Sequence, residues 1–454
     1  MVAISLALLM LSPLFFSCSQ QKSADMSDLL KTVPSSANGV VGINLSGMLK
    51  KIGCKIDGTT ITPGKDVNGW LDKLTGDDRQ EMEALLNGDS GIDPLGAILF
   101  YDANRTYITF AISDTEKFVA FVEKKTDAKF QQEDGGVSIC QNIAMKGAQA
   151  WMLVSGRGFD TDLLVSYCNL TTAQSFIQNP FGAEIATLTK DIVGWGKVTT
   201  LINSQLSFTQ ISTLNVINNL LFEDATAVSF SVEFLKGEMK SSFTMLNDKG
   251  KPAKYLLPDD RIDVSLVKSI AENTNCLFAM SLNKKLIEKL ENTFSMLIGQ
   301  SSYKYIEALK NADGTFAFAL GNDFNNVYEN VKGVMTTDGN ASIDLKSMLS
   351  NWAPISEDGK YIRFSRGTVQ GTLDVAKYAE KLKGATIGLA LSSDFISEVV
   401  RNDIESMVLK LDPDSGGMKF EFDLYGKEND QNILITLIQL FDKSGTNNFN
   451  LNIN

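Results

Sequence analysis

Cys18 is the residue whose surroundings indicate the clearest chemistry. It follows the apolar run LALLMLSPLFFS of residues 6–17, in which the small residue Ser17 stands directly before the thiol. The run is shorter than the roughly 20 apolar residues that a spanning helix needs, but its length suits the central part of an export signal. We therefore expect residues 1–17 to be a signal peptide that is cut away, and Cys18 to carry lipid on its sulfur.

The chain becomes polar directly after Cys18, with SQQKSAD over residues 19–25. A spanning helix would not stop there, so we expect residues 18–27 to be a lipidated tether. An export signal normally begins with Lys or Arg, and residues 1–17 contain neither, so we expect basic residues upstream in the precursor. The alternative interpretation is a buried first helix with an incidental cysteine.

Asp412 and Asp414 are weak candidates for a calcium site. They lie two residues apart before Gly416 and Gly417, as carboxylates do in calcium-binding loops. The fifth loop position is a glycine rather than a ligand, and the position of the usual bidentate Glu holds Asp423, within an expected strand. We therefore favour a solvated hairpin turn and expect no bound metal.

The sequence contains no histidine, which excludes several kinds of site. Ser-His-Asp and Cys-His catalysis, zinc held by histidine and a histidine proton shuttle are all ruled out. Residues 194–198, GWGKV, resemble a phosphate-binding loop, but Asp191 replaces its first glycine and Val198 its Ser or Thr. We expect a strand there, no catalytic residues and no cofactor anywhere in the chain.

A glycosidase needs only two carboxylates, so this class stays open as the alternative. The chain has 54 Asp and Glu residues, and a pair is therefore always available. Sugar sites also favour exposed tryptophan, but the four tryptophans lie scattered in mostly apolar surroundings, at Trp70, Trp151, Trp195 and Trp352. The alternative is a carboxylate-dependent glycan hydrolase or a glycan-binding protein.

The charge balance is acidic, with a formal net charge of −12 and a pI of about 4.8. Such a surface repels phosphates, and no basic stripe offsets the repulsion, so we expect no nucleic-acid partner. The remaining cysteines form no CxxC pattern, and we expect buried free thiols, although one disulfide stays possible. They are Cys54, Cys140, Cys168 and Cys276.

Periodicity predicts the elements that must position any site. Alternating apolar residues predict a hairpin over residues 226–246 with its turn near Lys236. We expect a strand over residues 38–45, followed by a helix that Ser46 caps. Another helix should begin at a capping box formed by Ser113 and Glu116.

The second part of the chain resembles the first. Residues 275–282, NCLFAMSL, resemble residues 38–45, and GGMK at 416–419 resembles GEMK at 237–240. We therefore expect an α+β fold of two similar halves, each a mainly antiparallel sheet with helices packed on one face. Chance recurrence of short strand patterns is the alternative. The expected segments are a first half at 28–250, a linker at 251–265 and a second half at 266–454.

Two short patterns are similar to a known class of proteins. Ser17-Cys18-Ser19 at the leader, and VPSSAN at 33–38 entering a strand, resemble the large uncharacterised lipoproteins of anaerobic diderm bacteria. The resemblance implies a lipid-anchored protein of the cell envelope, expected at the outer membrane, on its periplasmic or surface face. It implies no activity. Our leading interpretation is non-catalytic binding or scaffolding, with the membrane as partner and possible further partners among envelope proteins or glycans.

Overall fold

The computed structural model describes most of the chain after residue 24. The described ranges are 25–72, 74, 76–156, 158, 160–199, 221–256, 260–294, 308–321, 329–339, 343–396, 402–414 and 417–443. They belong to a mixed α+β fold with a large, mainly antiparallel sheet, as expected.

The chain divides into two compact units. The first unit comprises Met1–Ser204, Ala227–Lys236 and Asp430–Asn454, and the second comprises Gln205–Thr226 and Gly237–Asn429. The chain therefore leaves the first unit inside the expected hairpin and returns to it near its end. The halves expected at 28–250 and 266–454 follow a different division and stay a prediction.

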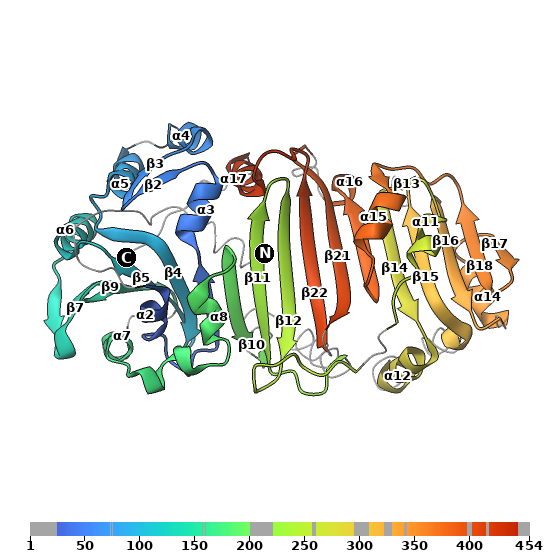
Figure 1. The fold of residues 1–454 in the computed structure, drawn as a ribbon, viewed down its shortest axis with the longest axis horizontal. Helices are drawn as coiled ribbons and strands as arrows, with labels where there is room; N and C mark the ends of the chain where they lie inside the picture. Colours follow the sequence, from blue (N-terminus) through green and yellow to red (C-terminus); the bar gives the residue numbers. More distant parts are fainter. Residues whose placement is uncertain are drawn as a thin grey trace. The chain divides into compact units, whose positions relative to one another are not determined.

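Antiparallel strands form the body of the first unit (Figure 1). They pair in the order β11-β10-β1-β4-β5-β9-β8-β7-β6. Their bounds are β1 Gly39–Ile43, β4 Ile92–Asp102, β5 Arg105–Ile112, β6 Gln131–Glu133, β7 Val137–Cys140, β8 Ile143–Lys146, β9 Gln149–Ser155, β10 Ile192–Lys197 and β11 Ala227–Leu235. A separate small hairpin joins β2 Lys55–Asp57 and β3 Thr60–Thr62.

Asn38 stands directly before β1, between the two strands that flank it. Its backbone N–H donates to the carbonyl of Tyr101 in β4 at 2.8 Å, and its own carbonyl accepts from the N–H of Lys197 in β10 at 2.8 Å. Both backbone polar groups of this residue are therefore satisfied, which a position between two strands requires.

The helices of the first unit are mostly short. They are α2 Met26–Leu30, α3 Leu45–Lys51, α4 Lys65–Leu71, α5 Gly76–Asn87, α6 Thr115–Thr126, α7 Thr161–Cys168, α8 Gly182–Thr187 and α17 Ile433–Lys443. Short 3-10 turns lie at η1 Asp134–Gly136, η2 Thr172–Gln174 and η3 Phe176–Gln178.

Two helix starts differ from the expected ones. Asn44 rather than Ser46 caps α3, since its Oδ1 accepts the N–H of Gly47 at 2.9 Å. Asp114 caps α6 and accepts two successive backbone N–H groups at 3.1 Å, whereas Ser113 is buried and does not cap the helix. In both cases an Asn or Asp close to the expected serine takes the N-cap position.

The second unit repeats this kind of pairing. Its strands pair antiparallel in the order β12-β22-β21-β20-β14-β15-β16-β18-β17. Their bounds are β12 Glu238–Leu246, β14 Cys276–Leu282, β15 Ala312–Leu320, β16 Val331–Thr337, β17 Ile355–Asp358, β18 Tyr361–Arg366, β20 Ile387–Ser392, β21 Ile404–Asp414 and β22 Gly417–Gly426. A two-stranded pair joins β13 Asn273–Thr274 to β19 Leu373–Asp374.

Asn275 stands directly before β14. Its backbone N–H donates to the carbonyl of Leu320 in β15 at 3.0 Å, and its carbonyl accepts from the N–H of Ser392 in β20 at 2.9 Å. Its side-chain Oδ1 also accepts from the Ser392 hydroxyl at 3.1 Å and from the N–H of Thr372 at 3.0 Å. The buried Asn275 therefore connects the start of β14 to β15, to β20 and to Thr372.

Helices cover both faces of the second unit's sheet, so the expectation of one covered face is wrong there. The helices are α11 Val264–Lys268, α12 Lys284–Phe294, α14 Ile343–Ser350, α15 Val375–Lys381 and α16 Ser393–Ile396, with a 3-10 turn at η4 Leu309–Asn311. Leu277 and Ala279 of β14 pack in one apolar cluster with α11 and α15, whereas Cys276 and Met280 pack in another with α12 and α14. The physical reason is that β14 is apolar at successive positions, and these point to opposite faces.

Candidate functional site

The expected lipidation residue, Cys18, lies outside the described residues, as do the leader and most of the tether. The described chain begins at Asp25, whose Oδ1 accepts the N–H of Asp28 at 2.9 Å and caps α2. Among the residues that the structure describes, no helix has the length and apolar character to cross a bilayer.

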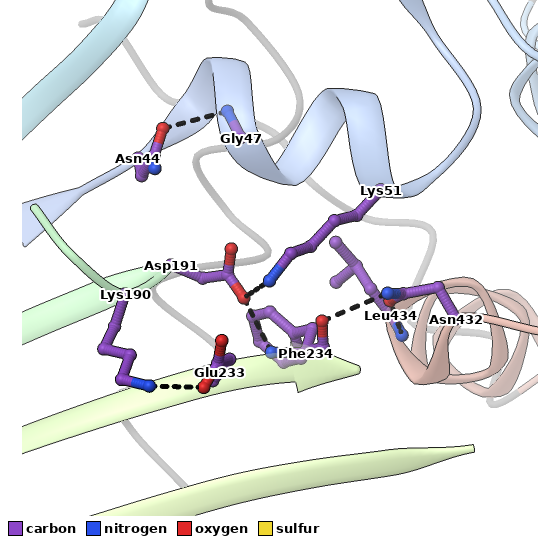
Figure 2. A network of polar contacts seen from close by, with 9 residues as sticks. All are labelled: Asn44, Gly47, Lys51, Lys190, Asp191, Glu233, Phe234, Asn432 and Leu434. Atoms are coloured by element: carbon purple, nitrogen blue, oxygen red, sulfur yellow. Dashed lines mark hydrogen bonds and ion pairs between the residues drawn. The ribbon is translucent and has the colours of Figure 1, made fainter. Parts of the chain in front are cut away.

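A buried carboxylate is the centre of one polar network in the first unit (Figure 2). Asp191 lies directly before β10 and is 2% exposed. Its Oδ2 accepts the Nζ of Lys51 at 2.6 Å and the backbone N–H of Phe234 at 2.6 Å. A buried charge needs such partners, because an unpaired carboxylate away from water is strongly unfavourable.

Asn432 extends this network to α17 (Figure 2). Its side-chain amide donates to the carbonyl of Phe234 at 3.1 Å, and its Oδ1 accepts the N–H of Leu434 at 3.0 Å, which caps the helix. The nearby pair of Lys190 and Glu233, at 2.6 Å, is more exposed. The network therefore holds α3, β10, β11 and α17 together, and we interpret it as structural.

A second polar cluster lies on α15 and β21 in the second unit. The hydroxyl of Tyr378 donates to Oε1 of Glu405 at 2.9 Å and lies 2.5 Å from the Ser406 hydroxyl. Lys377 also donates to the same Glu405 oxygen at 2.9 Å. Burial works to raise the pKa of Glu405, but the hydrogen bonds from Lys377 and Tyr378 outweigh it, and the pKa lies below its usual value.

Lys381, one turn further along α15, has different surroundings. Its Nζ lies 2.9 Å from the centroid of the Tyr425 ring and 5.3 Å from that of Tyr378. Within the described part of the chain, it forms no ion pair with a carboxylate. Burial, with the nearby charge of Lys377, lowers the pKa of Lys381 to about 8.

Asp423 lies two residues before Tyr425 in β22. The two side chains therefore point to the same face of the sheet. Asp423 lies opposite Lys240 of β12 and opposite Val408 of β21. Burial, followed by the charges of Glu421 and Glu238, raises the pKa of Asp423 to about 6. A perturbed lysine and a perturbed aspartate therefore lie on one face of the second unit's sheet.

The calcium candidates fall at the end of the β21–β22 hairpin. Asp412 lies opposite Lys419, and its Oδ1 is 4.0 Å from a guanidinium nitrogen of Arg261. The backbone of Asp414 pairs with Gly417. Among the described residues, no three or more Asp, Glu or Cys side chains gather as a metal site would require. Asp412 and Asp414 stay weak calcium candidates, and the absence of a bound metal stays a prediction.

Each unit has one described feature that bears on a glycan site, and the two are considered separately. Trp352 is 38% exposed, but its ring packs against Phe316, Phe318 and Phe364. A hollow of about 340 Å³ lies in the first unit, and among the described residues that line it only Glu133 carries a carboxylate. The described lining therefore lacks the second carboxylate that a hydrolase of this class requires.

The four described cysteines are all buried and free, as favoured from the sequence. Burial raises the pKa of Cys168 and of Cys276 to about 12. A thiol so reluctant to ionise is a poor nucleophile at neutral pH, because the thiolate is the reactive form.

Sequence reasoning missed both polar clusters. In the sequence, Asp191 was notable only because it replaces the first glycine of a phosphate-loop pattern. The strand that was expected instead of such a loop is confirmed as β10. The residues around Lys381 in the sequence do not indicate its contact with the Tyr425 ring, because Tyr425 belongs to a strand far along the chain. The spacing of Tyr378 and Lys381, three apart on one helix face, is the only hint in the sequence.

No protein-family model matches the chain, and no curated protein matches it. Three solved structures of TP0453 resemble it weakly, each with a TM-score of 0.30. The match to crystal form I has 9% sequence identity and covers 79% of this chain and 97% of that one. The match to crystal form III has 8% identity and covers 77% of this chain and 96% of that one. Form IV is 10% identical and covers 47% of this chain and 79% of that one. The chain is thus similar to TP0453 only distantly.

Proposed function

We propose that the chain is a lipid-anchored protein of the cell envelope that acts by binding or scaffolding rather than by catalysis. The leader at residues 6–17 followed by Cys18 carries this proposal. The first described helix, α2, begins at Met26, so few residues separate the proposed anchor from the folded body. Several acyl chains on one protein hold it stably at a bilayer, whereas a single chain holds it marginally.

The absence of histidine supports a non-catalytic role. The buried carboxylate of Asp191 is occupied by Lys51 and a backbone N–H, and the Glu405 carboxylate by Lys377 and Tyr378. Groups held in this way stabilise a fold, and Asp191 is not among the described residues that line the hollow in the first unit.

We also propose that the body consists of two similar halves. The support is that Asn38 and Asn275 make the same pair of backbone hydrogen bonds to the strands on either side. Each precedes a central strand, β1 or β14, that leads into a helix capped by asparagine. Those caps are Asn44, which accepts from Gly47, and Asn283, whose Oδ1 accepts the N–H of Leu286 at 2.8 Å.

The anchor can be tested in the native host by metabolic labelling with an alkyne fatty acid. We expect label on the wild-type protein, loss of label and release from membranes in Cys18→Ser, and no change in Ser19→Ala. Mass spectrometry should find acyl chains on an N-terminal Cys18. A freely diffusible, unacylated protein that keeps residues 1–17 would overturn the proposal.

The non-catalytic role has a separate test. Purified mature protein should leave a panel of envelope and dietary glycans intact, and turnover of any of them would support the glycan hydrolase instead. A glycan-binding protein is favoured only by the exposure of Trp352. Binding that is lost in Trp352→Ala but kept in Trp70→Ala would support that second candidate.

A further inference from the structure

The hollow of about 340 Å³ in the first unit lies over one face of the β6–β7 hairpin. Gln131 and Glu133 of β6 line it together with Ile139 of β7, which lies opposite Gln131. Small-molecule sites occupy roughly 300–1,000 Å³, so the hollow has room for a ligand at the lower end of that range.

The alternate residues of the same stretch make their contacts elsewhere. Gln132 donates from its side-chain amide to the Ser138 hydroxyl at 2.7 Å, and the ring of Phe130 lies 6.4 Å from that of Phe118. Successive side chains of an extended chain point to opposite faces. Those on the side of the hollow are Lys129, Gln131 and Glu133.

The described lining of the hollow carries one charge of each sign. Lys129 donates to Glu123 at 2.5 Å, but its side chain is 83% exposed, and an ammonium group has three N–H donors. Among the described residues, the Glu133 carboxylate has no partner. A ligand with a net positive charge would face Lys129, and one with a net negative charge would face Glu133. A zwitterion complements both groups.

Gln131 lies between these two charges in the sequence. Four residues of extended chain span about 13 Å, so the Cα atoms of Lys129 and Glu133 stand farther apart than the two charges of a single amino acid. A carboxamide both donates and accepts hydrogen bonds, as a peptide group does, so Gln131 suits an amide placed between the ligand's charges. Gln141 donates to the carbonyl of Thr126 at 3.2 Å, which holds its side chain at the hollow before a ligand binds.

We propose that this hollow is a binding site for short zwitterionic peptides of about dipeptide size. The peptide's carboxylate binds Lys129, its ammonium group binds Glu133, and its amide group pairs with Gln131. Ile139 and Ala128 provide apolar contact for a small side chain. None of these residues takes part in the proposed lipid anchor, so either property can fail without the other.

The test is isothermal titration calorimetry of the full mature protein, produced without lipid, with dialanine. We expect saturable binding with a Kd of about 1 mM, because exposed ion pairs each add little affinity. Free alanine should bind at least about threefold more weakly, and so should dialanine that is acetylated at its amine and amidated at its carboxylate. Equal binding by either control ligand, or no binding of dialanine, would overturn the proposal.

Matched variants locate the site on one face of β6. Gln131→Ala and Glu133→Gln should each weaken dialanine binding by about threefold to fivefold. Gln132→Ala, at the next position of the same strand, should leave it unchanged because Gln132 contacts Ser138 instead. Circular dichroism checks that the variants are folded, and if one unfolds, the ligand series with the wild type decides alone. Equal weakening by Gln131→Ala and Gln132→Ala would contradict the site.

Discussion

Asn432 donates from its side-chain amide to the backbone carbonyl of Phe234 at 3.1 Å, across 198 residues of sequence. The same side chain accepts from Leu434 and so begins α17. One residue therefore both starts a helix and attaches it to a strand.

Asn432→Ala should lower the free energy of unfolding of the first unit by about 1–2 kcal/mol, because it removes an N-cap and leaves a carbonyl without its partner. Denaturant unfolding monitored by fluorescence measures the change. Asn87→Ala, an exposed position at the end of α5, is the matched control and should change stability by less than about 0.5 kcal/mol. Equal effects in the two variants would contradict the structural role of Asn432.

Asp423 should make the second unit less stable as the pH rises. Its pKa is raised to about 6 in the folded protein, so the folded state binds the proton more tightly than the unfolded chain does. The stabilisation is complete below the unfolded value, near pH 4, and is lost as the pH rises through about 6.

Asp423→Asn should therefore raise the free energy of unfolding at pH 7 by about 1–2 kcal/mol and change it little at pH 4. Thermal unfolding across this range is the measurement. Asp313→Asn, at an exposed position, makes the same chemical change as a control. A gain at pH 4 as large as that at pH 7 would contradict the assignment.

Gly371 has no room for a side chain. A Cβ built there would lie 2.1 Å from the backbone carbon of Thr274, which cannot yield as a flexible side chain would. Gly371→Ala should destabilise the protein by about 2 kcal/mol or more. Gly69, within α4, has open space around it, and Gly69→Ala should stabilise by about 0.5–1 kcal/mol. Opposite signs in thermal melts of the two variants are the expected result.

Calcium should have little effect on this protein, because Asp412 lies opposite Lys419 and close to Arg261. We expect millimolar calcium to shift the melting temperature by less than about 1 °C, well below the shift that saturating binding produces. A larger shift that chelator reverses, and that Asp412→Asn and Asp414→Asn abolish, would instead support the calcium site.

The sequence predicted the strands better than the contacts between them. Alternation at Val228, Phe230 and Val232 is sufficient to place β11, since such a pattern needs only local information. The chain also turns where expected near Lys236, directly after the end of β11.

The polar clusters could not be predicted in the same way. Asp191 and Lys51 are 140 residues apart, and no local pattern indicates that they meet. Their pairing follows from the order of the strands, which periodicity does not determine. The predicted N-caps were wrong for a more local reason. Serine, asparagine and aspartate at two or three neighbouring positions can each cap a helix, and the backbone conformation determines which of them does so.

The first unit is interrupted by the whole span of Gly237–Asn429 and resumes at Asp430. During synthesis, residues 39–197 can pair their strands while α17 is still unmade, and all of 237–429 must be translated before α17 is available to join them. The first unit therefore begins to form before the second, but it can be completed only after the second has been translated. Until then, the residues of β11 that contact α17 lack that neighbour.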